Sequence, residues 1–268
     1  MAQPRAEPAQ PSADALLELA HELAHMAGAQ LRERFERGHE RAVRTKSTPT
    51  DLVSEADLAS ERAIRNLLSA RRPDDGFLGE EGGASRAGSS GLRWVVDPLD
   101  GTVNFLFGIP QWCVSVAVED AEGALAGVIF DPMRGETFAA LREGPATLNG
   151  ARVAGSTHDE LSTAMVATGF AYDAEVRAAQ AEVLTTVLPR VRDVRRMGSA
   201  ALDLAWTAAG RYDAFYERTV KPWDIAAGVL ICERAGLEVR MLEERPRLPA
   251  GVLAAAPGLV GPLLELVG

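Results

Sequence analysis

Two aspartates three positions apart follow an apolar segment, and this spacing could bring two carboxylates to one point. Trp94–Val96 is apolar and rich in β-branched valine, which predicts a buried strand. The strand is expected to end at Asp97, because Pro98 has no N–H to donate to a sheet. On the turn that follows, the carboxylates of Asp97 and Asp100 and the carbonyl of Leu99 can face one small volume. An all-oxygen set of this kind suits a hard cation, above all Mg²⁺.

Thr102 places a hydroxyl next to these carboxylates, where it could orient a water molecule bound to the cation. The segment also has a purely structural explanation, because Asp-Pro and Asp-Gly pairs are frequent in turns that carry no chemistry. The rest of the chain decides between a metal site and an ordinary turn.

A second segment of interest lies far downstream. Residues 94–105 read WVVDPLDGTVNF, and residues 223–228 read WDIAAG. In this order and at this separation, the two segments resemble the paired signatures of the inositol monophosphatase family, the metal-dependent, lithium-sensitive sugar phosphatases. The resemblance extends over about residues 12–267 and departs from the family pattern at Val103, where many relatives have threonine.

The resemblance implies a site for two or three Mg²⁺ ions. The metal ligands that it implies are Glu80, Asp97, the Leu99 carbonyl, Asp100 and Asp224. In the family pattern the residue at Asp97 bridges two ions about 3.5–4 Å apart, so that one ion activates a water molecule and the other stabilises the leaving oxygen. By itself, the acidic pair Glu80 and Glu81 is typical of a surface turn.

The resemblance also implies which residues act on the substrate. Thr102, polarised by Asp57, is expected to orient the attacking water, and Lys46 is expected to position water when its loop closes. The residues expected to hold the phosphate and the sugar hydroxyls are Asp100, Gly101, Thr102, Ala200, Glu217 and Asp224. Both residues also have a purely structural explanation. Asp57 would favour a helix N-terminus electrostatically, and Lys46 would be a solvated lysine.

The reaction expected of this site is hydrolysis of a small phosphate monoester, with inositol monophosphate as the first candidate substrate. Glu217 stands six positions before Trp223, which fits that branch of the family. The same chemistry on fructose 1,6-bisphosphate, histidinol phosphate or a 3′-phosphoadenosine nucleotide is one alternative. Another is an RNA- or transcription-associated partner protein with secondary phosphatase activity. The net charge of −10 disfavours a nucleic-acid partner, because such partners usually require a basic face.

A short segment near the N-terminus suggests a different metal. Residues 21–25 read HELAH, which matches the zinc-peptidase motif HExxH. Two histidines four positions apart lie on one helix face and can hold Zn²⁺. The longer form of the motif requires a third histidine where this chain has Leu31, and five-residue matches arise easily by chance. A zinc peptidase is therefore the weaker explanation.

Periodicity and turn residues divide the chain into helices and strands. Helices are predicted over residues 12–37, 54–68, 174–188, 198–209, 222–235 and 258–267. Strands are predicted over residues 76–79, 94–97, 113–119, 124–131, 136–141, 164–168, 212–216, 237–241 and 251–255. The strands from residue 113 to residue 141 indicate an antiparallel meander. The arginine-rich run 190–196 is expected to be solvated, with a phosphate or a second subunit as alternatives.

The pattern of elements establishes a mixed protein of helices and strands. The resemblance implies an α+β fold whose layers alternate as α-β-α-β-α, assembled as a homodimer. Residues 1–11 are expected to form a disordered lead-in, and residues 12–268 one domain with sub-layers of about residues 12–150 and 151–268. No apolar run approaches the roughly 20 residues of a membrane span, and Cys113 and Cys232 are expected to be buried thiols, so the cytoplasm is the expected compartment.

Overall fold

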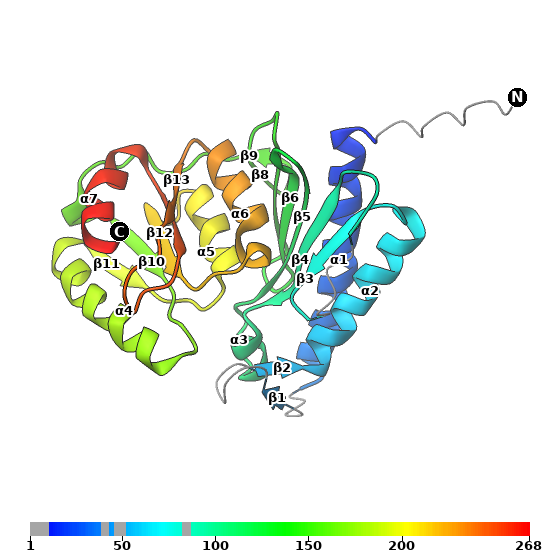
Figure 1. Ribbon diagram of the computed structural model, residues 1–268, viewed down its shortest axis with the longest axis horizontal. Coiled ribbons are helices and arrows are strands. Elements are labelled where there is room, and N and C mark those ends of the chain that lie inside the picture. The colour runs from blue at the N-terminus through cyan, green and yellow to red at the C-terminus, as the bar shows by residue number, and fades with distance from the viewer. Residues whose placement is uncertain (1–10, 39–42, 46–51, 82–86) are drawn as a thin grey trace, which may run out of the picture.

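Helices and sheets alternate in five layers, as Figure 1 shows. The computed structural model describes residues 11–38, 43–45, 52–81 and 87–268. The α-helices of this part of the chain are α1 Ala13–Glu36, α2 Glu55–Arg71, α3 Thr102–Leu106, α4 Ala174–Val187, α5 Ala200–Ala208, α6 Pro222–Arg234 and α7 Pro257–Val267. The expected order α-β-α-β-α is confirmed.

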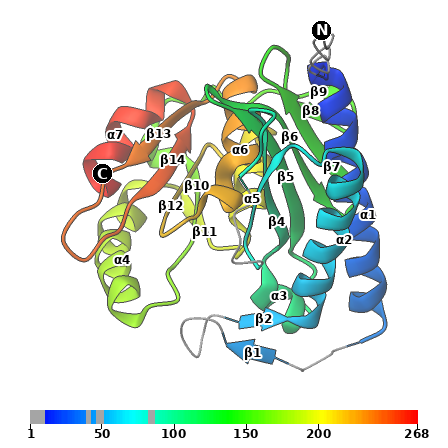
Figure 2. The ribbon, with the colours of Figure 1, turned by 45° about the vertical axis from the view of Figure 1, so that its right-hand side comes forward.

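The first sheet is formed by the first half of the chain, in the order β3-β4-β5-β6-β7-β8-β9. Strands β3 and β4 are parallel, and the other neighbours are antiparallel, which confirms the expected meander. The strands are β3 Gly76–Gly79, β4 Arg93–Asp100, β5 Cys113–Asp120, β6 Gly123–Asp131, β7 Glu136–Leu141, β8 Thr147–Leu148 and β9 Ala151–Arg152. A separate pair, β1 Val43–Thr45 and β2 Leu52–Ser54, lies beside α3 (Figure 2).

The second sheet is formed by the second half of the chain, in the order β11-β10-β12-β14-β13. Strand β10 is parallel to β11 and β12, whereas β14 is antiparallel to β12 and β13. The strands are β10 Met165–Thr168, β11 Asp193–Arg195, β12 Ala214–Arg218, β13 Glu238–Leu242 and β14 Gly251–Ala255. The sequence did not predict β11, because this three-residue edge strand lies in the arginine-rich run and has no apolar alternation.

Three apolar cores fill the spaces between the layers. Alternate residues of β4 serve two of them, because successive side chains of a strand point to opposite faces. Trp94 and Val96 pack in the core with α1 and α2, whereas Val95 packs in the core with α5 and α6. The third core lies between the second sheet and α7. Figure 2 shows α1 and α2 side by side over the outer face of the first sheet.

Helix α1 begins and ends where its capping residues predict. The Ser12 hydroxyl accepts a hydrogen bond from the Ala15 N–H at 3.2 Å, which satisfies one of the free donors of the first turn. Gly38, just beyond the helix, has a φ of 94°, a left-handed conformation that glycine adopts without strain. No helix in the described part of the chain is long and apolar enough to cross a membrane.

Helix α6 lies in the middle layer and packs closely on the first sheet. Pro222 is its first residue, where the fixed φ of proline suits a helix and its missing N–H costs nothing. A Cβ atom on Gly127 of β6 would lie 2.9 Å from Ala227 Cα of α6, which leaves no room for a side chain. Small residues on both elements therefore allow this close approach.

Candidate active site

A cavity of about 440 Å³ opens where the two halves of the chain meet. Its walls come from the ends of β3 and β4, from β12, from the first turns of α3, α5 and α6, and from the segment before α4. The predicted site residues that line it are Glu80, Asp97, Leu99, Asp100, Gly101, Thr102, Ala200, Glu217 and Asp224. Asp57 lies directly behind Thr102, and Lys46 is outside the described residues.

A β-bulge near the end of β4 carries the first two aspartates. Asp97 pairs with Ser115 of β5 and Asp100 with Cys113, so β4 holds one residue more than β5 over this interval. The prediction that the strand ends at Asp97 is wrong, because the bulge accommodates Pro98 and β4 continues to Asp100. The Leu99 N–H donates to Asp97 Oδ1 at 3.0 Å and fixes the orientation of that carboxylate.

Asp100 is held by residues from the other half of the chain. Its Oδ2 atom accepts hydrogen bonds from the Ser199 hydroxyl at 2.6 Å and from the Ala201 N–H at 2.7 Å. Ser199 is the N-cap of α5, so the carboxylate lies at a helix N-terminus, where free N–H groups and the helix dipole favour negative charge. The start of α5 therefore orients the Asp100 carboxylate.

Asp224 lies in the first turn of α6, as the sequence predicts. The Lys221 N–H donates to Asp224 Oδ2 at 2.6 Å, which closes a capping interaction at the start of the helix. One carboxylate oxygen is therefore held by the backbone, because the first turn of a helix has N–H groups that lack helical partners.

Thr102 and Asp57 form a buried pair beside the cavity. Thr102 Oγ1 lies 2.8 Å from Asp57 Oδ1 and 3.1 Å from the Leu99 carbonyl oxygen, so its single proton has two acceptors. Gly101, which precedes Thr102, has a φ of 94°, and a Cβ atom there would lie 2.8 Å from the Gln111 carbonyl oxygen. Only glycine fits at this position, and the turn that follows it directs the Thr102 hydroxyl to Asp57.

The acidic side chains of the cavity raise one another's pKa. Burial, above all, raises the pKa of the Asp97 carboxyl well above its usual value. The negative charges that raise it further belong to Glu80, Asp100 and Asp224. Burial and the neighbouring Asp100 raise the pKa of Asp224 to about 8. Burial, with the charges of Asp224 and Asp100, raises the pKa of Glu217 to about 8.

This donor set fits a hard divalent cation. The carboxylate and carbonyl oxygens are ligands that Mg²⁺ prefers, and a cation would relieve the repulsion that, after burial, raises these pKa values. Among the described residues, no three Asp, Glu, His or Cys side chains already converge closely enough to hold a metal ion. The cavity is thus acidic and oxygen-rich without a preformed cage.

The cavity is also lined by two basic side chains that the sequence did not assign to the site. Arg196 belongs to the arginine-rich run expected to be solvated, with a phosphate as one alternative; it is exposed, it lies on the cavity wall, and its charge lowers the pKa of Glu217. Lys221, next to the second signature, also lines the wall. The segment Phe170–Asp173 completes the rim. The phosphate alternative for the arginine-rich run, and the proximity of Arg196 to Ala200, were the sequence signals for this position.

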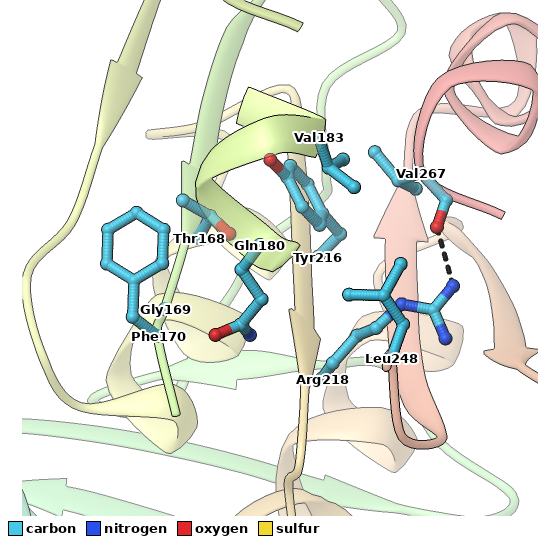
Figure 3. A pocket seen from close by; sticks show the side chains of 9 residues that line it. All are labelled: Thr168, Gly169, Phe170, Gln180, Val183, Tyr216, Arg218, Leu248 and Val267. Atoms are coloured by element: carbon cyan, nitrogen blue, oxygen red, sulfur yellow. Dashed lines mark hydrogen bonds between the residues drawn. The ribbon is translucent and has the colours of Figure 1, made fainter. Parts of the chain in front are cut away.

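A second, much smaller cavity shares Phe170 with the first, and Figure 3 shows the residues that line it. Its volume of about 10 Å³ is close to the space that one water molecule needs. The buried Arg218 guanidinium lines it and donates to the Val267 carbonyl oxygen at 2.6 Å. A sugar phosphate does not fit there, so the larger cavity is the candidate active site.

The HExxH segment of α1 does not form a zinc site in the described part of the chain. His25 Nε2 lies 2.9 Å from Thr137 Oγ1, and its ring stacks on Phe130 at 4.0 Å. Glu22 pairs with Arg71 of α2 at 3.1 Å. His25 and Glu22 therefore contact neighbouring elements, and no group of His, Cys, Asp or Glu that could hold a metal ion is found among the described residues.

Comparison with known proteins agrees with this architecture. The structure of the extragenic suppressor protein SuhB from Bartonella henselae superposes with a TM-score of 0.86 at 36% identity, covering 94% of this chain and 98% of that one. This likeness defines the fold class. The model of the inositol monophosphatase family matches residues 12–264, so the chain belongs to that family, and membership implies a phosphatase.

Two curated relatives show the range of functions within the family. The chain is 46% identical over 234 residues to the inositol-1-monophosphatase SuhB of Mycobacterium tuberculosis, covering 83% of this chain and 80% of that protein. It is 37% identical over 255 residues to the Nus factor SuhB of Pasteurella multocida, covering 94% and 95%. One relative is thus named for a phosphatase activity and the other as a Nus factor.

Proposed function

We propose that the protein is a Mg²⁺-dependent phosphatase that hydrolyses a small phosphate monoester, with inositol monophosphate as the first candidate substrate. The observation that carries this proposal is that four acidic residues from three separate segments, Glu80, Asp97, Asp100 and Asp224, line one cavity. Family membership and the relative named inositol-1-monophosphatase SuhB support the same reaction.

In this proposal, Glu80, Asp97, the Leu99 carbonyl, Asp100 and Asp224 would hold two or three Mg²⁺ ions. The ions would lower the pKa of the attacking water and neutralise charge on the phosphoryl and leaving oxygens.

The protein's own groups then act on the water and on the ester. When Thr102 donates its proton to Asp57, its oxygen is left to accept a hydrogen bond from the attacking water and orient it. The backbone N–H groups of Gly101 and Thr102, at the start of α3 beside the cavity, are proposed to contact the phosphate.

Glu217, Asp224 and the N-terminus of α5 at Ala200 are proposed to bind the sugar hydroxyls. Glu217 is held in place by close packing, because a Cβ atom on Gly169 would lie 2.0 Å from its Oε2 atom. A carboxylate fixed in this way can accept hydrogen bonds from a polyol, which favours a sugar alcohol as the leaving group. Lys46 is proposed to act from its loop, and the assembly is proposed to be a homodimer.

A role as a Nus factor is the second candidate, because the relative from Pasteurella multocida carries that name. The net charge of −10 opposes a direct contact with RNA, since phosphate contacts depend on basic side chains.

The test is phosphate release by metal-stripped protein to which Mg²⁺ is restored. The substrates are myo-inositol 1-phosphate, fructose 1,6-bisphosphate, histidinol phosphate and 3′-phosphoadenosine 5′-phosphate. Mg²⁺-dependent release that lithium suppresses, with one ester preferred, supports the proposal and names the substrate. Failure to hydrolyse any ester, in a protein that binds Mg²⁺, contradicts it and favours the second candidate.

A further inference from the structure

Helix α2 buries a short polar stripe. Asp57, Ser60 and Glu61 have exposed fractions of 0%, 1% and 3%. Positions i, i+3 and i+4 of a helix lie on one face, so the three side chains point to the same side. Farther along, Ile64 and Leu68 are buried in the apolar core. Buried polar groups require partners, and the partners of this stripe lie around the active site.

Each of the three residues contacts a different segment of the site. Asp57 accepts the Thr102 hydroxyl. Ser60 donates to the Pro98 carbonyl oxygen at 3.0 Å, within the bulge between Asp97 and Asp100. Glu61 Oε2 accepts the Glu81 N–H at 2.7 Å. One helix face therefore contacts three of the segments that lie at the acidic cavity, namely the end of β3, the bulge of β4 and the start of α3.

Glu61 is confined from several sides. A Cβ atom on Gly79 would lie 2.5 Å from its Oε2 atom, so the end of β3 passes directly over the carboxylate. Its other oxygen lies 3.3 Å from Arg65 Nη1, and the Arg65 guanidinium stacks over Phe77 of β3 at 5.0 Å. The carboxylate is thus fixed in position and reaches the backbone immediately after Glu80.

We propose that Glu61 is a positioning residue for the metal site. By holding the Glu81 N–H, it fixes the backbone at the end of β3 so that the Glu80 carboxylate faces Asp97. This inference rests on the proposed metal site and adds a residue that does not contact the cation. Loss of a group that orients a metal ligand typically lowers metal affinity about 10–100-fold.

The experiment separates the reach of the side chain from its charge. Glu61→Gln keeps an acceptor at the same distance and removes the charge. Glu61→Asp keeps the charge, but it is shorter by one methylene, about 1.5 Å, and no longer reaches the Glu81 N–H. Glu61→Met keeps the length and removes the acceptor. Mn²⁺ affinity of each variant is measured by electron paramagnetic resonance of the free ion, alongside thermal unfolding in metal-free buffer.

Asp75→Asn serves as the matched control. Asp75 is 1% exposed, pairs with Arg72 at 2.8 Å and accepts the Trp94 indole N–H at 2.9 Å, but it lies before β3, at the opposite end from Glu80. Its substitution is expected to lower the unfolding temperature and leave Mn²⁺ affinity unchanged.

The proposal predicts about 10–100-fold weaker Mn²⁺ binding for Glu61→Asp and Glu61→Met, and binding within about threefold of wild type for Glu61→Gln. If either Glu61→Asp or Glu61→Met does not fold, the other variant provides the comparison. Equal losses in Glu61→Gln and Glu61→Asp, or wild-type affinity in a folded Glu61→Met protein, overturn it. If the wild-type protein does not bind Mn²⁺, the metal site itself is overturned. If the Glu61 variants bind Mn²⁺ as tightly as the wild type and the protein still releases phosphate, only the role of Glu61 is overturned and the proposed function stands.

Discussion

Thr102 Oγ1 lies 2.8 Å from Asp57 Oδ1, although 45 positions separate the two residues in the chain. Asp57 is fully buried on α2, and Thr102 is the first residue of α3 at the edge of the cavity. A buried carboxylate next to a hydroxyl holds that hydroxyl as a donor, which leaves the oxygen lone pairs for a water molecule.

This pair leads to a prediction for Thr102. Thr102→Ser keeps the hydroxyl and is expected to retain most of the phosphatase activity. Thr102→Val has nearly the same shape and cannot orient water, so kcat should fall roughly 10²–10⁴-fold, the usual contribution of a positioned proton-transfer group. The measurement is steady-state phosphate release at saturating Mg²⁺. Comparable kcat values for the two variants would show that the hydroxyl has no part in the reaction.

Asp97 provides the second prediction, because its carboxylate is buried and faces three other acids. Asp97→Asn should lower Mg²⁺-dependent turnover by about 10³-fold or more, since the proposed ligand shared by two ions loses its charge. The metal-free variant should unfold at a higher temperature than the metal-free wild type, because one of the mutually repelling carboxyls is gone. Turnover near that of wild type by a folded Asp97→Asn protein would contradict the two-ion site.

The third prediction concerns pH. The pKa values of Asp224 and Glu217 are raised to about 8 in the folded, metal-free protein, against ordinary values of 3.8 and 4.5. Between about pH 4 and pH 8 the folded state therefore binds more protons than the unfolded state, so the free energy of unfolding falls as pH rises through this window. Added Mg²⁺ should accordingly raise the unfolding temperature more at pH 8 than at pH 5.5.

Calorimetry of Asp224→Asn in metal-free buffer is the control for this prediction. The variant has one raised carboxyl fewer, so its stability should decline less steeply between pH 5.5 and pH 8 than that of the wild type. Parallel pH profiles for the two proteins would show that Asp224 does not titrate in this range.

The fourth prediction tests the close contact between α6 and the first sheet. A Cβ atom on Gly127 would meet Ala227 Cα at 2.9 Å, so Gly127→Ala should lower the free energy of unfolding by about 1–3 kcal/mol, the usual cost of overpacking a core. Gly261→Ala on α7 is the control, because a Cβ atom there meets nothing within 4 Å. That change should be neutral or stabilise the helix by up to about 1 kcal/mol. The measurement is the free energy of unfolding of both variants in urea. Equal values would show that α6 and the first sheet can move apart at Gly127 without cost.

Much of the candidate site could be predicted from local sequence, but its orientation could not. The Asp97 to Asp100 spacing and the position of Asp224 just after Pro222 are short-range features, and all three aspartates line the cavity. The continuation of β4 through Pro98 depends on pairing with β5, which accommodates the bulge. No property of residues 97–100 alone reveals that partner.

The chain by itself determined most of the longer elements, the acidic signatures and the family, because caps, periodicity and short motifs act over a few neighbouring residues. Tertiary structure alone decided that Ser199 holds Asp100, that Arg196 lines the cavity and that Glu61 reaches the backbone beside Glu80. These contacts join segments from different layers. Their distances depend on how sheets and helices pack, which no local pattern specifies.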